Sequence, residues 1–212
     1  MTLDLTTELA AARVLAVIRG TDTAAAVATG TALLKEGVRI VEVALTTPGA
    51  LHAIEAIRAA APAEALVGAG TVLTAADVAD VLSAGAQFVV TPAVVESVPE
   101  AVRRGIPVAA GALTPTEAYT ARQLGASAVK LFPASLGGPA YLKALRDPFP
   151  DIPFVAVGGV GLAEMPAYLA AGAIAVGVGG PLVGDAASGG DLDALRHRAR
   201  AYLAAATRPP AS

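Results

Sequence analysis

Lys130 stands inside an otherwise apolar run, AVKLF at 128–132, whereas Lys35 and Lys143 belong to polar helical patterns. Because neighbouring side chains of a strand point to opposite faces, Lys130 faces away from Val129 and Leu131. Burial disfavours the charged form of an amine, and a neutral amine can attack a ketone to form a Schiff base. The alternative is a structural lysine that reaches solvent or pairs with a carboxylate.

Glu42 interrupts a second apolar run, IVEVAL at 40–45, in the same way. A carboxylate beside an amine can transfer protons as a general acid and base, although Glu42 could instead serve only as a counter-ion. Arg19 follows the apolar run 14–18. Its guanidinium could bind a substrate carboxylate through two hydrogen bonds and, near Lys130, favour the neutral amine. A solvated charge at a strand end is the plainer interpretation of Arg19.

Two glycine-rich turns follow late apolar runs, at 157–160 and 177–181. Backbone N–H groups in such turns can hold a phosphate, although tight turns also need glycine for conformational reasons. The predicted phosphate-binding residues are Gly158, Gly159, Gly179 and Gly180. Thr71, after another apolar run, offers a hydroxyl that could contact a ligand or cap a helix, a role for which Thr74 and Asp77 compete.

The elements that would position these residues alternate along the chain. Near-continuous apolar runs, typical of parallel strands covered on both faces, occur at 14–18, 40–45, 66–68, 88–90, 108–110, 128–132, 154–157 and 174–178. Alanine-rich segments with helical spacing occur at 22–35, 50–60, 75–83, 99–104, 115–124 and 163–171. This alternation predicts an α/β fold, a (β/α)₈ TIM barrel, in preference to a doubly wound open sheet.

We expect a single domain over residues 1–206 and a loose tail at 207–212. An extra helix at 6–12 would close the bottom of the barrel, and residues 191–206 would form the last outer helix. Glycine follows many of the helical segments, at 37, 85, 105, 125 and 172, where it fits a left-handed C-cap.

Composition limits the functional classes. The 212 residues carry a formal net charge of −3, with no cysteine and two histidines, which argues against disulfides, thiolate nucleophiles and metal sites. No basic stripe suits nucleic acid. The uncharged stretch 165–184 contains glycines and prolines unsuited to a membrane helix, and the first residues do not resemble a signal peptide. We therefore expect a cytoplasmic protein without nucleic-acid or membrane partners.

The chain resembles the 2-keto-3-deoxy-6-phosphogluconate/4-hydroxy-2-oxoglutarate aldolase family. The matching segments are GVRIVEV (37–43), VGAGTV (67–72), GAQF (85–88), VKLFPA (129–134) and GGV (158–160). The resemblance implies a (β/α)₈ barrel, usually a homotrimer, that needs no metal or organic cofactor. By position, Lys130 resembles the Schiff-base lysine and Glu42 the general acid/base. The substrate-binding residues by resemblance are Arg19, Thr71, Pro92 and Phe132.

Three positions depart from the family pattern. Val157 stands where many members have threonine, Gly180 where many have serine, and Thr46 where some have a substrate-binding arginine. The expected reaction is cleavage of a small keto acid, a 2-keto-3-deoxy-6-phospho sugar acid of the gluconate type, to pyruvate and glyceraldehyde 3-phosphate. Alternatives are the 6-phosphogalactonate or 4-hydroxy-2-oxoglutarate substrate, a phosphate-binding epimerase or isomerase, and a non-catalytic sugar-acid binder.

Overall fold

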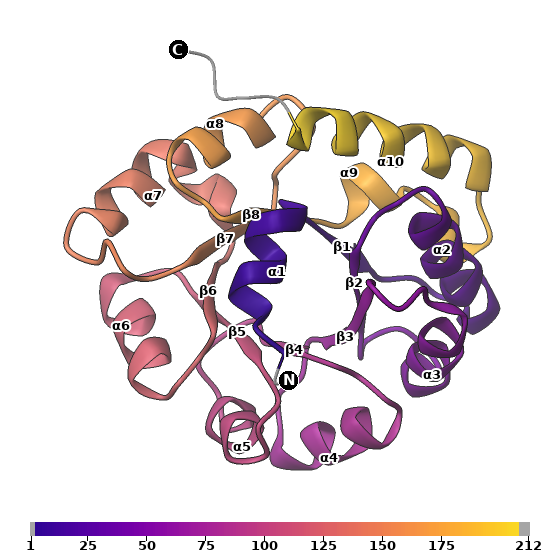
Figure 1. Cartoon of the computed structure of the whole chain (residues 1–212), viewed down its shortest axis with the longest axis horizontal. Helices are drawn as coiled ribbons and strands as arrows, with labels where there is room; N and C mark the ends of the chain where they lie inside the picture. Colours follow the sequence, from indigo (N-terminus) through magenta and orange to yellow (C-terminus); the bar gives the residue numbers. More distant parts are fainter. Residues whose placement is uncertain (1–2, 208–212) are drawn as a thin grey trace.

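The computed structural model describes residues 3–207. Its strands close into an all-parallel barrel in chain order, so that β8 pairs with β1 (Figure 1). The strands are β1 Val14–Ile18, β2 Ile40–Ala44, β3 Leu66–Gly70, β4 Val89–Val90, β5 Val108–Ala112, β6 Ala128–Leu131, β7 Phe154–Val157 and β8 Ala175–Val178. The (β/α)₈ prediction is therefore confirmed.

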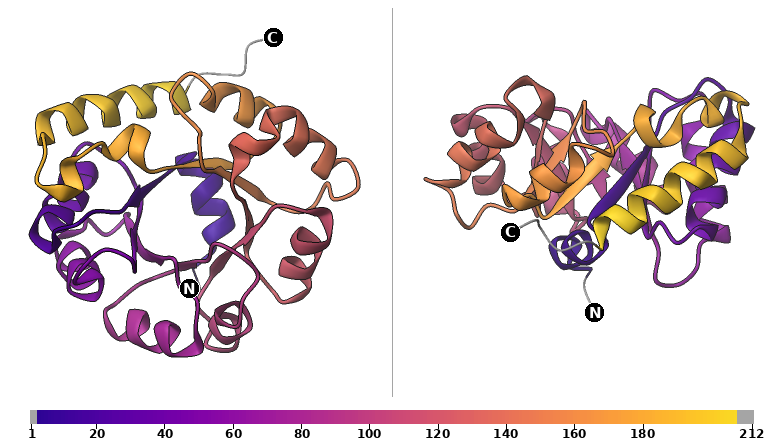
Figure 2. Two further views of the ribbon diagram at one scale, coloured as in Figure 1. Left: turned by 180° about the vertical axis from the view of Figure 1, so that it is seen from behind. Right: turned by 90° about the horizontal axis from the view of Figure 1, so that it is seen from above.

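Helices form a ring around the strands, except α1, which lies across one end of the barrel (Figures 1 and 2). They are α1 Leu5–Ala12, α2 Thr23–Lys35, α3 Ala50–Ala60, α4 Ala75–Ser83, α5 Ser97–Arg103, α6 Pro115–Gln123, α7 Gly138–Arg146, α8 Met165–Ala170, α9 Gly180–Val183 and α10 Leu192–Ala206. Two 3₁₀ turns, η1 Ala134–Leu136 and η2 Ala186–Ser188, complete the connections.

Side-chain caps and left-handed glycines explain where several helices begin and end. Thr74 and Thr114 each form a capping box with the acidic residue three positions later, at the starts of α4 and α6. The predicted C-terminal glycines at 37, 85, 105, 125 and 172 all have φ between 72° and 96°. Each helix is thereby turned back toward the next strand.

Alternation along the strands creates two apolar layers. The side chains facing the helices form the larger cluster, and those facing the lumen form a smaller one that includes Leu15, Ile40 and Phe88. Leu5 and Leu9 of α1 belong to the lumen cluster, and Figure 2 shows α1 beneath the barrel. The expected helix over the bottom of the barrel is present.

The structure corrects several predicted boundaries. β3 and β5 run on to Gly70 and Ala112, and β4 is shorter than the predicted 88–90. Pairing with neighbours on both sides holds small residues in a strand despite their weak intrinsic preference. Lys143 lies in α7, in agreement with its helical pattern, but no bounds were predicted for α7, α9 or the two 3₁₀ turns. Apart from Thr207, the predicted tail lies outside the described residues.

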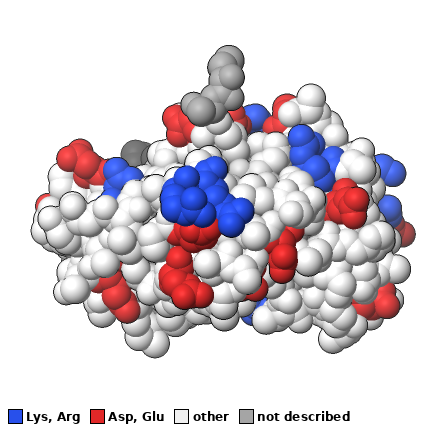
Figure 3. Space-filling view, turned by 90° about the horizontal axis from the view of Figure 1, so that it is seen from below, with Lys and Arg blue, Asp and Glu red and all other residues white. Residues whose placement is uncertain are grey.

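Charged groups are sparse on one face of the molecule. On the face shown in Figure 3, acidic and basic side chains are interspersed among mostly uncharged residues. Within residues 3–207, no helix has both the length and the apolar character needed to cross a bilayer.

Candidate active site

Lys130 lies in the middle of the site, on the lumen side of β6. Its Cα pairs with Gly111 of β5 and Val155 of β7, and the residue is only 7% exposed. The Nζ atom lies over the ring of Phe132, 5.2 Å from its centroid. No acidic side chain among residues 3–207 forms an ion pair with this amine, so the salt-bridged alternative is not what the structure shows.

Glu42 is more deeply buried than the lysine. It projects from β2, is 1% exposed, and its Oε2 atom has no hydrogen-bond partner among the described residues. Burial raises the pKa of the Glu42 carboxyl above its ordinary value, and the positive charges of Lys130 and Arg19 oppose that rise. A carboxyl group in this environment takes up a proton more readily than one in water, as a proton-transfer group requires.

Arg19 and Thr71 come together at the upper rim of the lumen. The exposed guanidinium of Arg19 donates a hydrogen bond from Nη2 to Thr71 Oγ1 at 3.4 Å. Thr71 has φ 59°, a left-handed conformation that is rare for a β-branched residue. The N-cap of α4 is Thr74, so capping does not account for Thr71. Such strained residues concentrate at functional sites.

One cavity of about 200 Å³ joins these side chains to the glycine turns. The predicted residues that line it are Lys130, Arg19, Thr71, Pro92, Phe132, Gly158, Gly159, Gly179 and Gly180. Glu42 does not line the cavity. Val17 does, although it was not among the predicted site residues, and so does Gly177 of the second predicted glycine turn. Val17 lies in β1, two positions before Arg19, which follows the strand. Strand alternation could therefore have placed Val17 on the lumen side.

The two glycine turns present unpaired backbone donors at this cavity. No backbone carbonyl among residues 3–207 accepts a hydrogen bond from the N–H groups of these four glycines. Gly158 and Gly159 have φ 92° and 71°, and a Cβ on either would collide with Phe132 or Ser135. Glycine is therefore required here for conformation and for space. Gly180 is different, because a Cβ there would meet nothing within 4 Å.

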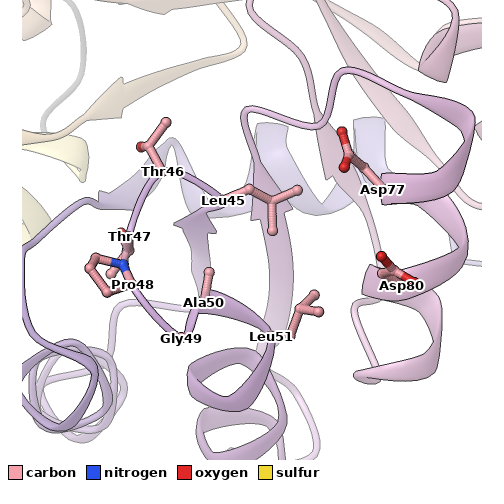
Figure 4. A pocket seen from close by; sticks show the side chains of 9 residues that line it. All are labelled: Leu45, Thr46, Thr47, Pro48, Gly49, Ala50, Leu51, Asp77 and Asp80. Carbon is pink, nitrogen blue, oxygen red and sulfur yellow. The ribbon is translucent and has the colours of Figure 1, made fainter.

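Thr46 does not join the other predicted residues. It is exposed and lines a separate cavity of about 490 Å³, between the loop that follows β2 and helix α4. Figure 4 shows Leu45 and Leu51 between that loop and the carboxylates of Asp77 and Asp80. Thr46 therefore does not line the cavity of Lys130, and its assignment as a substrate-binding residue stays a prediction. Thr46 lies past the end of β2, where strand alternation no longer directs side chains.

Within residues 3–207, no group of three histidine, aspartate or glutamate side chains converges as metal ligands would. The polar groups at the cavity are instead an amine, a guanidinium, a hydroxyl and backbone donors, above a buried carboxyl group. This set can bind an anionic substrate at both ends and place a nucleophile between them.

Known proteins similar to this chain agree with the resemblance found in its sequence. Residues 5–197 match the profile of the KDPG and KHG aldolase family. A probable 2-dehydro-3-deoxy-6-phosphogalactonate aldolase of Rhizobium meliloti (strain 1021) is 38% identical over 193 residues, 90% of each chain.

Two solved structures extend the likeness to three dimensions. The native KDPGal structure is 36% identical, with a TM-score of 0.85 over 91% of this chain and 93% of that one. The KDPG aldolase of Legionella pneumophila, solved with pyruvate captured at low pH as a covalent carbinolamine, is 29% identical, with a TM-score of 0.81 over 97% of each chain. This chain belongs to the KDPG and KHG aldolase family.

Proposed function

We propose that this chain is a class I aldolase that cleaves a 2-keto-3-deoxy-6-phospho sugar acid of the gluconate type to pyruvate and glyceraldehyde 3-phosphate. The observation that carries the proposal is Lys130, a buried amine without an acidic partner at a cavity beside a buried carboxyl group. The covalent pyruvate carbinolamine of the Legionella relative supports the same chemistry.

The reaction begins when the neutral Lys130 amine adds to the C2 ketone. Glu42 assists the loss of water, and the resulting iminium is an electron sink. Glu42, directly or through water, then removes the C4 hydroxyl proton, and the C3–C4 bond breaks as its electrons enter the iminium. The aldehyde leaves, Glu42 returns a proton to C3 of the enamine, and hydrolysis of the new iminium frees pyruvate.

The remaining cavity residues bind the two ends of the substrate. Arg19, held by Thr71, pairs with the carboxylate at C1, and Pro92 and Phe132 form the apolar wall beside the keto group. The unpaired N–H groups of Gly158, Gly159, Gly179 and Gly180 accommodate the phosphate. The 6-phosphogalactonate substrate is the second candidate, because the Rhizobium relative carries that name and the family includes both kinds of enzyme.

The assembly and compartment are part of the same proposal. The chain forms a homotrimer in the cytoplasm, as the resemblance to the family implies. Light scattering on the purified protein tests the assembly, since a trimer has three times the chain mass of 20.8 kDa. A mass of one or two chains at working concentration contradicts it.

Trapping with pyruvate and borohydride tests the proposed mechanism. Reduction of the iminium fixes the pyruvate carbons to the attacking amine, and digestion then locates the added mass. We expect the label on Lys130 and none on Lys35 or Lys143, the remaining lysines of the chain. Lys130→Met should abolish labelling, whereas Lys143→Met should not change it. An epimerase, an isomerase or a sugar-acid binder has no use for an amine, so an unlabelled Lys130 would overturn the proposal.

A further inference from the structure

Gly70, the last residue of β3, lies directly against the side chain of Glu42. A Cβ atom placed on Gly70 would be 2.7 Å from Glu42 Oε1, 2.9 Å from Cδ and 3.4 Å from Cγ. Ordinary contacts of a Cβ atom begin near 3.4 Å. No side chain therefore fits at position 70 while the carboxylate keeps its present place.

The backbone at Gly70 does not itself call for glycine. Its φ lies outside the left-handed region, and its Cα pairs with Ala44 of β2 and Val90 of β4 as in a regular ladder. Glycine in a strand interior costs conformational entropy and contributes no packing. What Gly70 provides here is space, on the side where Glu42 lies.

Little else restrains the carboxylate. Glu42 Oε2 has no hydrogen-bond partner among residues 3–207, and no ion pair anchors the group there. Steric contacts with the surrounding residues, rather than a directional hydrogen bond, therefore set the position of the carboxyl group. A side chain added at Gly70 would therefore displace the Glu42 carboxyl group directly.

We propose that Gly70 is a positioning residue, whose missing side chain sets where the Glu42 carboxyl group stands in relation to Lys130 and the bound substrate. This inference rests on the proposed function, because it assigns Gly70 a part in the proton transfers given to Glu42. Gly70 touches no substrate and acts only through that carboxyl group.

The direct test is Gly70→Ala. The atoms that must yield are the end of a flexible side chain, so the protein folds and the carboxyl group shifts instead. We expect kcat for aldol cleavage to fall by about 10- to 100-fold, since a displacement of about 1 Å can cost that much. KM should change by less than kcat, and pyruvate with borohydride should still label Lys130. Ala69→Gly is the matched control, because it changes one methyl group on the opposite face of β3, and its kcat should stay unchanged.

A double-mutant cycle separates positioning from a general effect on the fold. In a Glu42→Gln background no acid/base group remains to be displaced, so adding Gly70→Ala should lower kcat no further. In a Glu42→Asp background the shorter side chain leaves room for a methyl group, so Gly70→Ala should cost less than in the unmodified protein. Equal losses from Gly70→Ala in all three backgrounds would overturn the inference, and so would an unchanged kcat in Gly70→Ala alone.

Whether the variants fold provides a second test of the same inference. If Gly70→Ala does not fold but Glu42→Ala/Gly70→Ala does, the two side chains compete for one space and the inference holds. If neither variant folds, the space is not shared and the inference is overturned. A fully active Glu42→Gln would instead overturn the role of Glu42 under the proposed function, so the two failures are distinguishable.

Discussion

At the level of single residues, the main feature of this molecule is a pair of buried ionisable side chains, Lys130 and Glu42. Lys130 and Glu42 occupy a lumen that is otherwise filled by apolar side chains. Removing such groups from water is costly, and Glu42 recovers little of that cost because Oε2 makes no hydrogen bond among residues 3–207. The carboxyl group is thus expected to reduce stability, whereas its proposed role is proton transfer in the reaction.

Glu42→Gln should therefore change activity and stability in opposite directions. Loss of the acid/base group should lower kcat for cleavage by about 10²- to 10⁴-fold, while pyruvate trapping remains detectable. Because burial raises the pKa of the Glu42 carboxyl, its favourable contribution to folding is present at low pH and is lost as pH rises through the folded-state pKa. The variant should gain in Tm relative to the unmodified protein most at neutral pH, and less near pH 4.5, the ordinary carboxyl pKa.

Thermal unfolding of both proteins across this pH range measures the effect. A Tm difference that does not vary with pH would show that Glu42 titrates alike in the folded and unfolded chains. A loss of activity below about tenfold would make Glu42 a structural residue, since positioned acid/base groups contribute more.

At the scale of elements, the ends of the strands determine what the site can bind. The turn after β7 is held in left-handed conformations by Gly158 and Gly159, and Ser135 N–H donates to the carbonyl of Gly158 at 3.0 Å. The turn after β8 leads straight into the short helix α9, which begins at Gly180. Both turns bring backbone N–H groups to the cavity, so the proposed phosphate site consists of backbone donors and has no side-chain hydroxyl.

Gly180→Ser should widen the preference for phosphorylated substrate. Space is free at this position, and a hydrogen bond to a charged group contributes about 1.5–3 kcal/mol, roughly ten- to a hundredfold in binding. The measurement is kcat/KM for phosphorylated over unphosphorylated 2-keto-3-deoxygluconate. Gly180→Ala is the control, since it adds the Cβ without the hydroxyl and should leave the ratio nearly unchanged. If the unmodified protein already favours the unphosphorylated acid, the glycine turns do not bind phosphate.

In the molecule as a whole, closure of the barrel produces a lumen whose two ends differ: one is packed with apolar side chains and the other opens into the cavity. The end under α1 is apolar, with Leu5 and Leu9 packed into the lumen cluster. The opposite end carries the cavity with Lys130, Arg19 and the glycine turns. Stability and chemistry thus occupy separate halves of one barrel, as is general for this architecture.

Leu9→Ala tests this separation. Leu9 is fully buried under the barrel, and truncation of a buried leucine costs about 2–5 kcal/mol in unfolding free energy. The kcat of the folded variant should equal that of the unmodified protein, because α1 lies at the end away from the cavity. Leu51→Ala, at a leucine of α3 that is 38% exposed, should cost less stability. A catalytic defect in Leu9→Ala at a temperature where it is fully folded would contradict the separation.

Local patterns of residues are enough to specify the order of the elements and the faces of the strands. Apolar runs between alanine-rich helical segments predicted all the strands, and left-handed glycines marked the helix ends, because both signals depend on neighbouring residues alone. Period-two alternation also assigned Lys130 and Glu42 to the lumen side. The glycine turns and the pair of Arg19 and Thr71 could be placed at the same rim, since parallel strands end together.

Which side chains meet across the lumen depends on how the barrel closes. The sequence showed no sign that Glu42 stands below the cavity without an ion pair, that Thr46 lies at a different cavity, or that Gly70 keeps space for a carboxyl group. These facts depend on the register in which β2 and β3 pair and on the closure of β8 against β1. Contacts between strands far apart in the chain arise only when the barrel closes, so no local pattern of residues can specify them.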